Sequence, residues 1–183
     1  MADFFANFGL EQGLAIGSAL LALASFILNL RLVGRQEKRN AVAMKMAHDS
    51  DVIGWSDDVI VLLATTQEML VEKGVSYPEA EFRGRRSAAR AQLSALIDRG
   101  RLFFPNRADG DYGVDKEAGF QGRRHPALDV LVEAYGHLDR AGSPPGPDRE
   151  TSDQLTVCRR KFMAEVFMSV DPVRRGEKMK ELT

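Results

Sequence analysis

The chain has 183 residues, 28% of them charged, and 25 Lys and Arg residues nearly balance 26 Asp and Glu residues, for a formal net charge of −1. A chain so close to neutrality lacks the overall basic charge that draws proteins to nucleic acid, so no nucleic-acid partner is predicted. The single cysteine, Cys158, excludes an intramolecular disulfide framework and is typical of a reducing compartment.

An uncharged run from Gly13 to Leu30 dominates the N-terminal part of the sequence. Its eighteen residues would rise about 27 Å as a helix, and continuation to Val33 brings the length to about 30 Å, one hydrocarbon core. Uncharged runs of this length exceed those usual in the core helices of soluble proteins. We therefore predict a transmembrane helix over residues 13–33; the alternative is a buried helix of a soluble protein.

The charges that flank this run are asymmetric. Asp3 and Glu11 precede it without any Lys or Arg, whereas a basic cluster with Glu37 as its one acidic residue follows it: Arg31, Arg35, Lys38, Arg39 and Lys45. The positive-inside rule then places residues 1–12 outside and the rest of the chain in the cytoplasm. The acidic leader argues against a cleaved signal peptide. We expect a single-pass protein of the cell membrane with its N-terminus outside.

Small and polar residues recur along the predicted membrane helix at spacings of three and four. They form an association face that comprises Ala15, Ser18, Ala22, Ser25 and Asn29. Small side chains let two helices approach closely, and Ser and Asn can form hydrogen bonds across the contact. This pattern predicts self-association or docking on another membrane span; the alternative is the ordinary Ala and Ser content of membrane helices.

Residues 34–50 have the composition of a basic juxtamembrane helix. Arg35, Lys38 and Arg39 are predicted to contact anionic lipid or an acidic partner. Gly34 allows a bend, so the sequence leaves open whether this helix continues the membrane helix or is separate.

Residues 51–170 are predicted to form a cytoplasmic helical domain. Four segments carry apolar residues at helical spacing and end at Gly or Pro. The run 59–63 is apolar enough for a buried strand, but its helix-forming flanks favour a helix. Trp55 is expected in the core. The expected core stripes are Ile53, Ile60, Leu63 and Leu70; Phe82, Ala89, Leu93, Leu96 and Ile97; Leu128, Leu131, Tyr135 and Leu138; and Leu155, Cys158, Phe162, Val166 and Val170.

The segment from Pro78 to Gly100 also carries the densest basic patch in the chain. Glu79 and Glu81 each stand four residues before an arginine, in the order that favours helical ion pairs, whereas Arg86 and Arg90 have no such local partner. These two arginines either belong to a solvated face or contact anionic lipid or an acidic partner. The C-terminal tail, residues 171–183, adds a second basic cluster that includes Arg174 and Arg175.

Two further local predictions can be tested by structure. Leu102, Phe103 and Phe104 are too apolar for an exposed loop, so we expect them to pack beneath the helices. Thr151 and Gln154 match the capping box that marks a helix N-terminus.

No catalytic, cofactor or metal site is predicted. A calcium loop beginning at Asp109 would need Gly and Glu where Val114 and Phe120 stand, and no two of the three histidines have the i, i+4 spacing of a helical metal pair. Cys158 falls on a buried stripe, which favours a structural role. The long irregular stretch 106–125 can at most form a polar site, and no small-molecule ligand is predicted.

The sequence thus predicts an all-α protein: one N-terminal transmembrane helix followed by a cytoplasmic bundle of about four helices. The leading hypothesis is a membrane-tethered interaction or scaffold module whose partner is the membrane and either a second copy or another membrane protein. The alternatives are a regulatory domain that reads anionic lipid through its Arg and Lys faces, and an enzyme with a site around residues 101–125.

Overall fold

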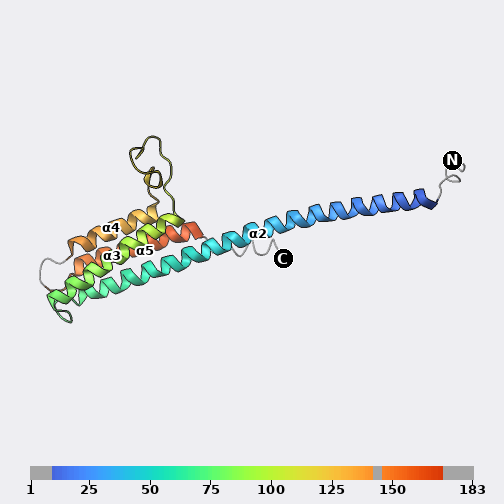
Figure 1. The fold of residues 1–183 in the computed structure, drawn as a ribbon. Helices are drawn as coiled ribbons and strands as arrows, with labels where there is room; N and C mark the ends of the chain where they lie inside the picture. Colours follow the sequence, from blue (N-terminus) through green and yellow to red (C-terminus); the bar gives the residue numbers. More distant parts are fainter. Residues whose placement is uncertain (1–9, 142–145, 171–183) are drawn as a thin grey trace. The chain divides into compact units, whose positions relative to one another are not determined.

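The structure is a computed structural model that describes residues 10–141 and 146–170 (Figure 1). The described residues form four α-helices and one short 3-10 helix, with no strand among them, which confirms the predicted all-α class. The elements in chain order are α2 (Leu10–Val71), α3 (Glu79–Phe103), η1 (Ala118–Phe120), α4 (Pro126–Arg140) and α5 (Arg149–Val170).

The chain divides into two compact units, residues 1–47 and residues 48–183. Helix α2 has 62 residues and belongs to both units, so the predicted membrane helix and the first helix of the bundle are one element, uninterrupted at Gly34 and Gly54. Helix α2 is long and apolar enough to cross a membrane by length and composition, and its most apolar stretch is not buried.

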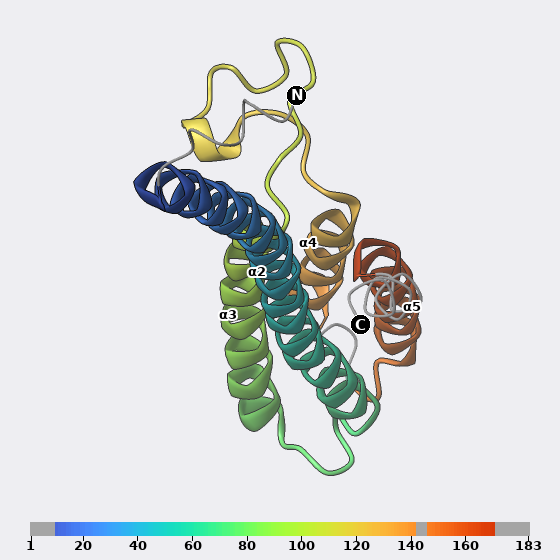
Figure 2. The ribbon, with the colours of Figure 1, turned by 90° about the vertical axis from the view of Figure 1, so that its right-hand side faces the viewer.

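The second unit is a bundle in which α3, α4, α5 and the part of α2 from residue 48 onward lie side by side (Figures 1 and 2). Side chains of α2 reach two of the neighbouring helices. The indole nitrogen of Trp55 donates a hydrogen bond to the carbonyl oxygen of Leu96 in α3, at 2.9 Å, and the Gln67 amide nitrogen donates one to the Thr156 hydroxyl of α5, at 2.6 Å. These long-range bonds set the register of α2 against its neighbours.

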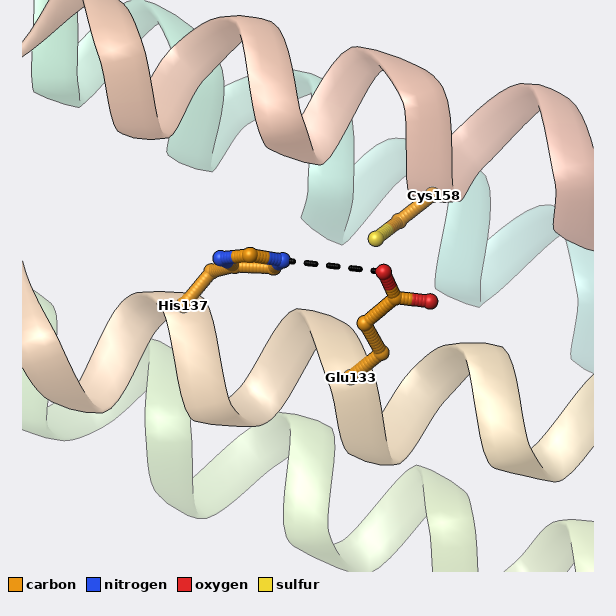
Figure 3. A group of neighbouring side chains, drawn as sticks. All are labelled: Glu133, His137 and Cys158. Atoms are coloured by element: carbon orange, nitrogen blue, oxygen red, sulfur yellow. Dashed lines mark ion pairs between the residues drawn. The ribbon is translucent and has the colours of Figure 1, made fainter.

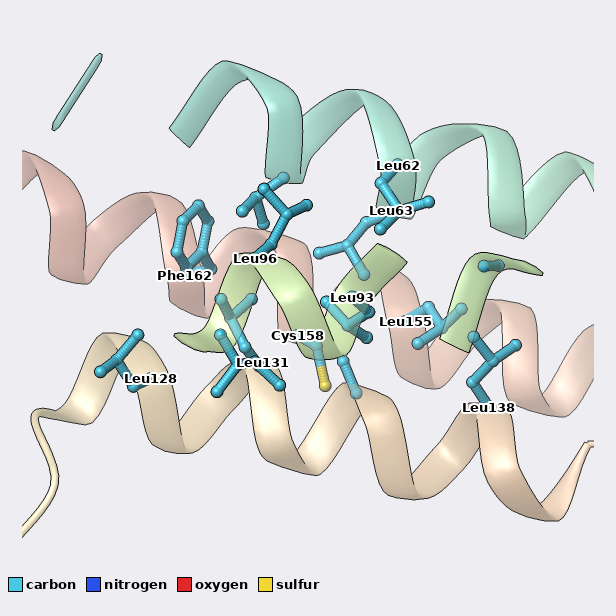
Figure 4. Packing of buried hydrophobic residues seen from close by; sticks show 14 of the residues in the cluster. Leu62, Leu63, Leu93, Leu96, Leu128, Leu131, Leu138, Leu155, Cys158 and Phe162 are labelled. Carbon is cyan, nitrogen blue, oxygen red and sulfur yellow. The ribbon is translucent and has the colours of Figure 1, made fainter. Parts of the chain in front are cut away.

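The core of the bundle is built on leucines, which gather around Phe162 in Figure 4, and on further buried aromatic rings. Trp55 is fully buried, as predicted, and its ring centroid lies 5.4 Å from that of Phe162 and 5.7 Å from that of Phe104. Burial of a large apolar side chain contributes about 1.5–3 kcal/mol. The predicted stripe residues Leu63, Leu70, Phe82, Ala89, Leu93, Leu96, Ile97, Leu128, Leu131, Leu138, Leu155, Cys158, Phe162, Val166 and Val170 are all buried.

Three local predictions were wrong. Leu102 is 80% exposed, because the last turn of α3 points it away from the bundle, and Phe104 is the one buried residue of that trio. Ile53 is 44% exposed rather than part of the core. The predicted capping box of Thr151 and Gln154 does not begin a helix, because α5 already begins at Arg149. Its N-terminus is capped by Asp148, whose carboxylate accepts hydrogen bonds from the backbone amide and the hydroxyl of Thr151.

The long stretch between α3 and α4 has structure of its own. Arg107 and Arg123 exchange two backbone hydrogen bonds of 2.8 Å, which close the stretch into a loop whose ends lie beside α4. Gly122 makes this possible, because its φ is +78° and a Cβ atom there would stand 2.2 Å from the Arg107 carbonyl oxygen. These backbone bonds therefore close the base of the loop.

Candidate functional site

An apolar groove runs between α2 and α5 on the surface of the bundle. Its volume is about 280 Å³. It is lined by Ile53, Ser56, Asp57 and Ile60 of α2 and by Met163, Val166, Phe167 and Val170 of α5. Phe167 is 59% exposed, and the neighbouring Met168 is 84% exposed. Apolar side chains gathered at a groove are a surface suited to binding another protein.

A basic pocket of about 400 Å³ lies where the 104–125 loop meets α3 and α4. Its lining contains four cationic side chains, Arg101, Lys116, Arg123 and Arg124, against one carboxylate, that of Asp129. The other lining residues are Asn106, Tyr112, Phe120, Gly122 and Pro126. An excess of positive charge in a concave surface favours anions.

Several polar atoms of this pocket are buried without a hydrogen-bond partner within the described part of the chain. They are the guanidinium Nε atoms of Arg101 and Arg124 and the amide Oδ1 of Asn106. The arginines of the pocket also have charged and aromatic neighbours. Arg124 pairs with Asp129 at 3.1 Å, and Arg123 pairs with Asp109. The Arg101 Nε lies 3.7 Å from a carboxylate oxygen of Asp98, and its guanidinium lies 4.6 Å from the centre of the Phe120 ring. Buried donors without partners are costly, so this pocket is a place where an added acceptor would be stabilised.

The two arginines that lacked a local partner in α3 have partners in the folded bundle. Arg86 donates a hydrogen bond to the carbonyl oxygen of Ala141 at the end of α4. Arg90 donates to the Tyr135 hydroxyl at 3.0 Å and pairs with Asp139 at 2.7 Å. The expected local pairs also form, Arg83 with Glu79 at 3.9 Å and Arg85 with Glu81 at 2.8 Å. Contact of Arg86 and Arg90 with lipid stays a prediction, and it would compete with the contacts that both side chains make inside the bundle.

The other predicted contact residues lie in helix α2 or in the tail. Arg35, Lys38 and Arg39 are exposed in α2, whereas Arg174 and Arg175 lie outside the described residues. Of the association face, Ser18, Ala22, Ser25 and Asn29 are exposed, and Ala15 belongs to the same helix. The role of this face as a helix contact stays a prediction.

A cluster that sequence reasoning missed joins α4 and α5. One potential ligand atom from each of Glu133, His137 and Cys158 lies within 4.8 Å of the other two (Figure 3). The three histidines include no i, i+4 pair, but Glu133 and His137 have that spacing on α4. Cys158 is buried, as predicted, and its burial together with the Glu133 carboxylate raises the pKa of its thiol to about 11.

His125 closes the N-terminus of α4. Its Nδ1 accepts a hydrogen bond of 3.2 Å from the backbone amide of Ala127, and its ring stacks on Phe104 with 4.5 Å between centroids. Burial, followed by the nearby positive charge of Arg107, lowers the pKa of this imidazole. His125 is thus a neutral capping group.

No family model, no curated protein and no solved structure matches this chain.

Proposed function

We propose that this protein is a membrane-tethered interaction module whose cytoplasmic bundle binds a second copy of the chain. The observation that carries the tether is the exposure of the apolar run of α2. Its large side chains from Ile16 to Val33 are 45–71% exposed. Leu, Ile, Phe and Val each favour insertion at the centre of a membrane helix by about 0.3–0.6 kcal/mol, and the run contains no opposing charge before Arg31.

The orientation follows from the charges that flank the run. The exposed Arg35, Lys38 and Arg39 stand on its C-terminal side, where they can lie against the anionic cytoplasmic leaflet. Each basic residue near such a surface contributes about 1 kcal/mol of attraction to anionic lipid. This attraction favours the same orientation as the positive-inside rule. The bundle is then displayed in the cytoplasm.

The apolar groove supports the choice of a second copy as its occupant. The groove is concave, and the exposed Phe167 in its wall and the exposed Met168 next to it in sequence are large apolar groups of the kind that would enter the groove of a second copy. A surface that contains both a hollow and the side chains to fill it is self-complementary, which suits a two-fold contact. Membrane tethering raises the local concentration of copies, so a modest contact area suffices.

The association face of α2 supports the same proposal. Ser18, Ala22, Ser25 and Asn29 repeat every three or four residues, as in helices that pack closely in membranes. Paired membrane helices would bring two bundles together, and the groove would then fix their contact.

Crosslinking in native membranes tests this proposal. Phe167→Asp is expected to reduce the crosslinked dimer strongly, because it places a charge at the contact. Val157→Asp is the matched control, since Val157 is also an exposed apolar residue of α5 but does not line the groove. Ser25→Leu with Asn29→Leu tests the membrane contact in the same assay. Equal dimer in Phe167→Asp and Val157→Asp, or a different protein as the main product, would contradict the second copy.

The basic pocket supports a second candidate function, the binding of a small anion, at the stretch 101–125 where the sequence left an enzyme site as an alternative. The buried Nε of Arg124, which has no hydrogen-bond partner in the described part of the chain, favours it. Phosphate, compared with chloride at equal ionic strength, is expected to raise the melting temperature of the full chain. Arg124→Gln should abolish this increase, whereas Arg99→Gln should keep it, because Arg99 is an exposed arginine paired with Asp58 away from the pocket.

Lipid recognition by the basic faces remains an alternative to protein contact. It predicts that the residues from 35 onward contribute to binding of anionic vesicles and that added salt releases them. Equal binding to neutral vesicles would remove the electrostatic explanation.

A further inference from the structure

The cluster of Glu133, His137 and Cys158 combines three chemically different side chains at the contact of α4 and α5. Glu133 and His137 stand one helical turn apart on α4, so that they share a face, and Cys158 approaches from α5. Figure 3 shows the three side chains pointing toward one another. One atom of each, a carboxylate oxygen, an imidazole nitrogen and the sulfur, lies within 4.8 Å of the other two.

We propose that Glu133, His137 and Cys158 bind one divalent transition-metal ion with the preferences of zinc. Thiolate sulfur, imidazole nitrogen and carboxylate oxygen together form a ligand set that zinc accepts in proteins. Three protein ligands leave the fourth tetrahedral position for water or a substrate group. This site is separate from the apolar groove and from the basic pocket, so it is independent of the proposed interaction.

The distances suit such an ion after a small adjustment. Zinc lies about 2.0–2.3 Å from its ligands, which places tetrahedral ligand atoms about 3.3–3.6 Å apart. The three atoms are already within 4.8 Å, so each has to approach by about 1 Å or less. Glu133, whose side chain is 47% exposed, has the freedom to turn, while the buried Cys158 provides a fixed point.

The charges around the cluster also suit a divalent cation. The Cys158 thiolate and the Glu133 carboxylate would together balance a charge of +2. Lys161 lies 3.5 Å from one oxygen of Glu133, and His137 Nε2 lies 3.8 Å from the other. The lysine therefore holds the outer oxygen and leaves the inner one directed at the imidazole and the sulfur.

Binding requires changes at Cys158, His137 and Arg140. The S–H bond of Cys158 breaks, its proton leaves to solvent and a sulfur–metal bond forms, with no transfer of electrons. His137 has to carry its hydrogen on Nδ1 so that the Nε2 lone pair faces the ion. The Arg140 guanidinium, now 3.3 Å from Nδ1, is exposed and would turn away to solvent.

Cobalt titration of the full chain in detergent, after treatment with a chelator, tests the site. We expect one equivalent of Co²⁺ to bind with a sulfur-to-cobalt charge-transfer band, and Zn²⁺ to displace it. Cys158→Ser should remove the band, and Glu133→Gln or His137→Gln should each weaken binding at least about tenfold, since loss of even a supporting residue costs that much.

Matched variants distinguish this site from nonspecific metal binding. His48→Gln and Glu150→Gln remove an exposed histidine and an exposed carboxylate elsewhere, and both should bind Co²⁺ as the unaltered chain does. Far-UV circular dichroism checks that each variant keeps its helices. The absence of the charge-transfer band in the unaltered chain would overturn the proposal, and so would Co²⁺ affinity that is equal in folded Glu133→Gln and Glu150→Gln.

Discussion

Gly100 is the position at which the packing of the bundle can be tested most sharply. A Cβ atom there would stand 2.5 Å from Cζ2 of Trp55 and 2.6 Å from Cδ2 of Leu128. Both neighbours are fully buried, so neither can move into solvent to make room. Gly84 lies in the same helix, and a Cβ atom added there would meet nothing within 4 Å.

Alanine at these two positions should therefore have opposite effects on stability. In an open helical position, Gly→Ala stabilises by about 0.8–1.0 kcal/mol, which is the expectation for Gly84→Ala. At Gly100 the same gain is set against about 1–3 kcal/mol of overpacking against Trp55 and Leu128. The two variants should differ in unfolding free energy by about 1–3 kcal/mol, with Gly100→Ala the less stable, which corresponds to about 2–12 °C in melting temperature.

Thermal unfolding of the full chain in detergent, followed by far-UV circular dichroism, measures this difference. The fluorescence of Trp55, the single tryptophan, should change in Gly100→Ala and remain unchanged in Gly84→Ala. If Gly100→Ala were as stabilising as Gly84→Ala and left Trp55 unperturbed, the close approach of α3 to Trp55 would be refuted.

Three further predictions follow from local contacts. Asp148→Ala should destabilise the fold by about 0.5–2 kcal/mol, measured by urea unfolding, because the amide of Thr151 loses its cap. Because the pKa of His125 is lowered in the folded chain, the unfolded chain binds a proton at this imidazole at higher pH than the folded chain does. The free energy of unfolding should therefore fall as the pH drops below about 6.5. Melting curves of His125→Asn should show a smaller loss. Burial raises the pKa of Cys158 from 9.0 to about 11, so the contribution of its neutral thiol to stability is fully present below pH 9 and is lost as the pH rises toward about 11. Melting curves of Cys158→Ala should show a smaller loss of stability at alkaline pH.

The positions of the helices could be predicted because local signals determine them. Gly and Pro mark the ends of the bundle helices, and the apolar spacing identifies their buried faces, which is why Leu131, Leu155 and Phe162 are in the core as expected. The error at Leu102 arose because three consecutive apolar residues cannot all face inward at the end of a helix.

The candidate sites depend on contacts between helices, which a single sequence does not specify. Arg90 finds Asp139 only because α3 packs beside α4, and Cys158 meets Glu133 and His137 only because α5 packs beside α4. The i, i+4 pair of Glu133 and His137 was visible in the sequence, but its third member was not. The cap at Asp148 was hidden by the equally plausible box that begins at Thr151.

Thiol labelling in intact cells tests the central claim, a membrane tether with a cytoplasmic bundle. In a Cys158→Ala background, one cysteine is placed on each side of the apolar run, by Gln12→Cys or Gln36→Cys, and a membrane-impermeant maleimide is added before and after lysis. The account predicts that Gln12→Cys reacts in intact cells and that Gln36→Cys reacts only after lysis. Reaction of both positions only after lysis, with the protein in the soluble fraction, would contradict the tether.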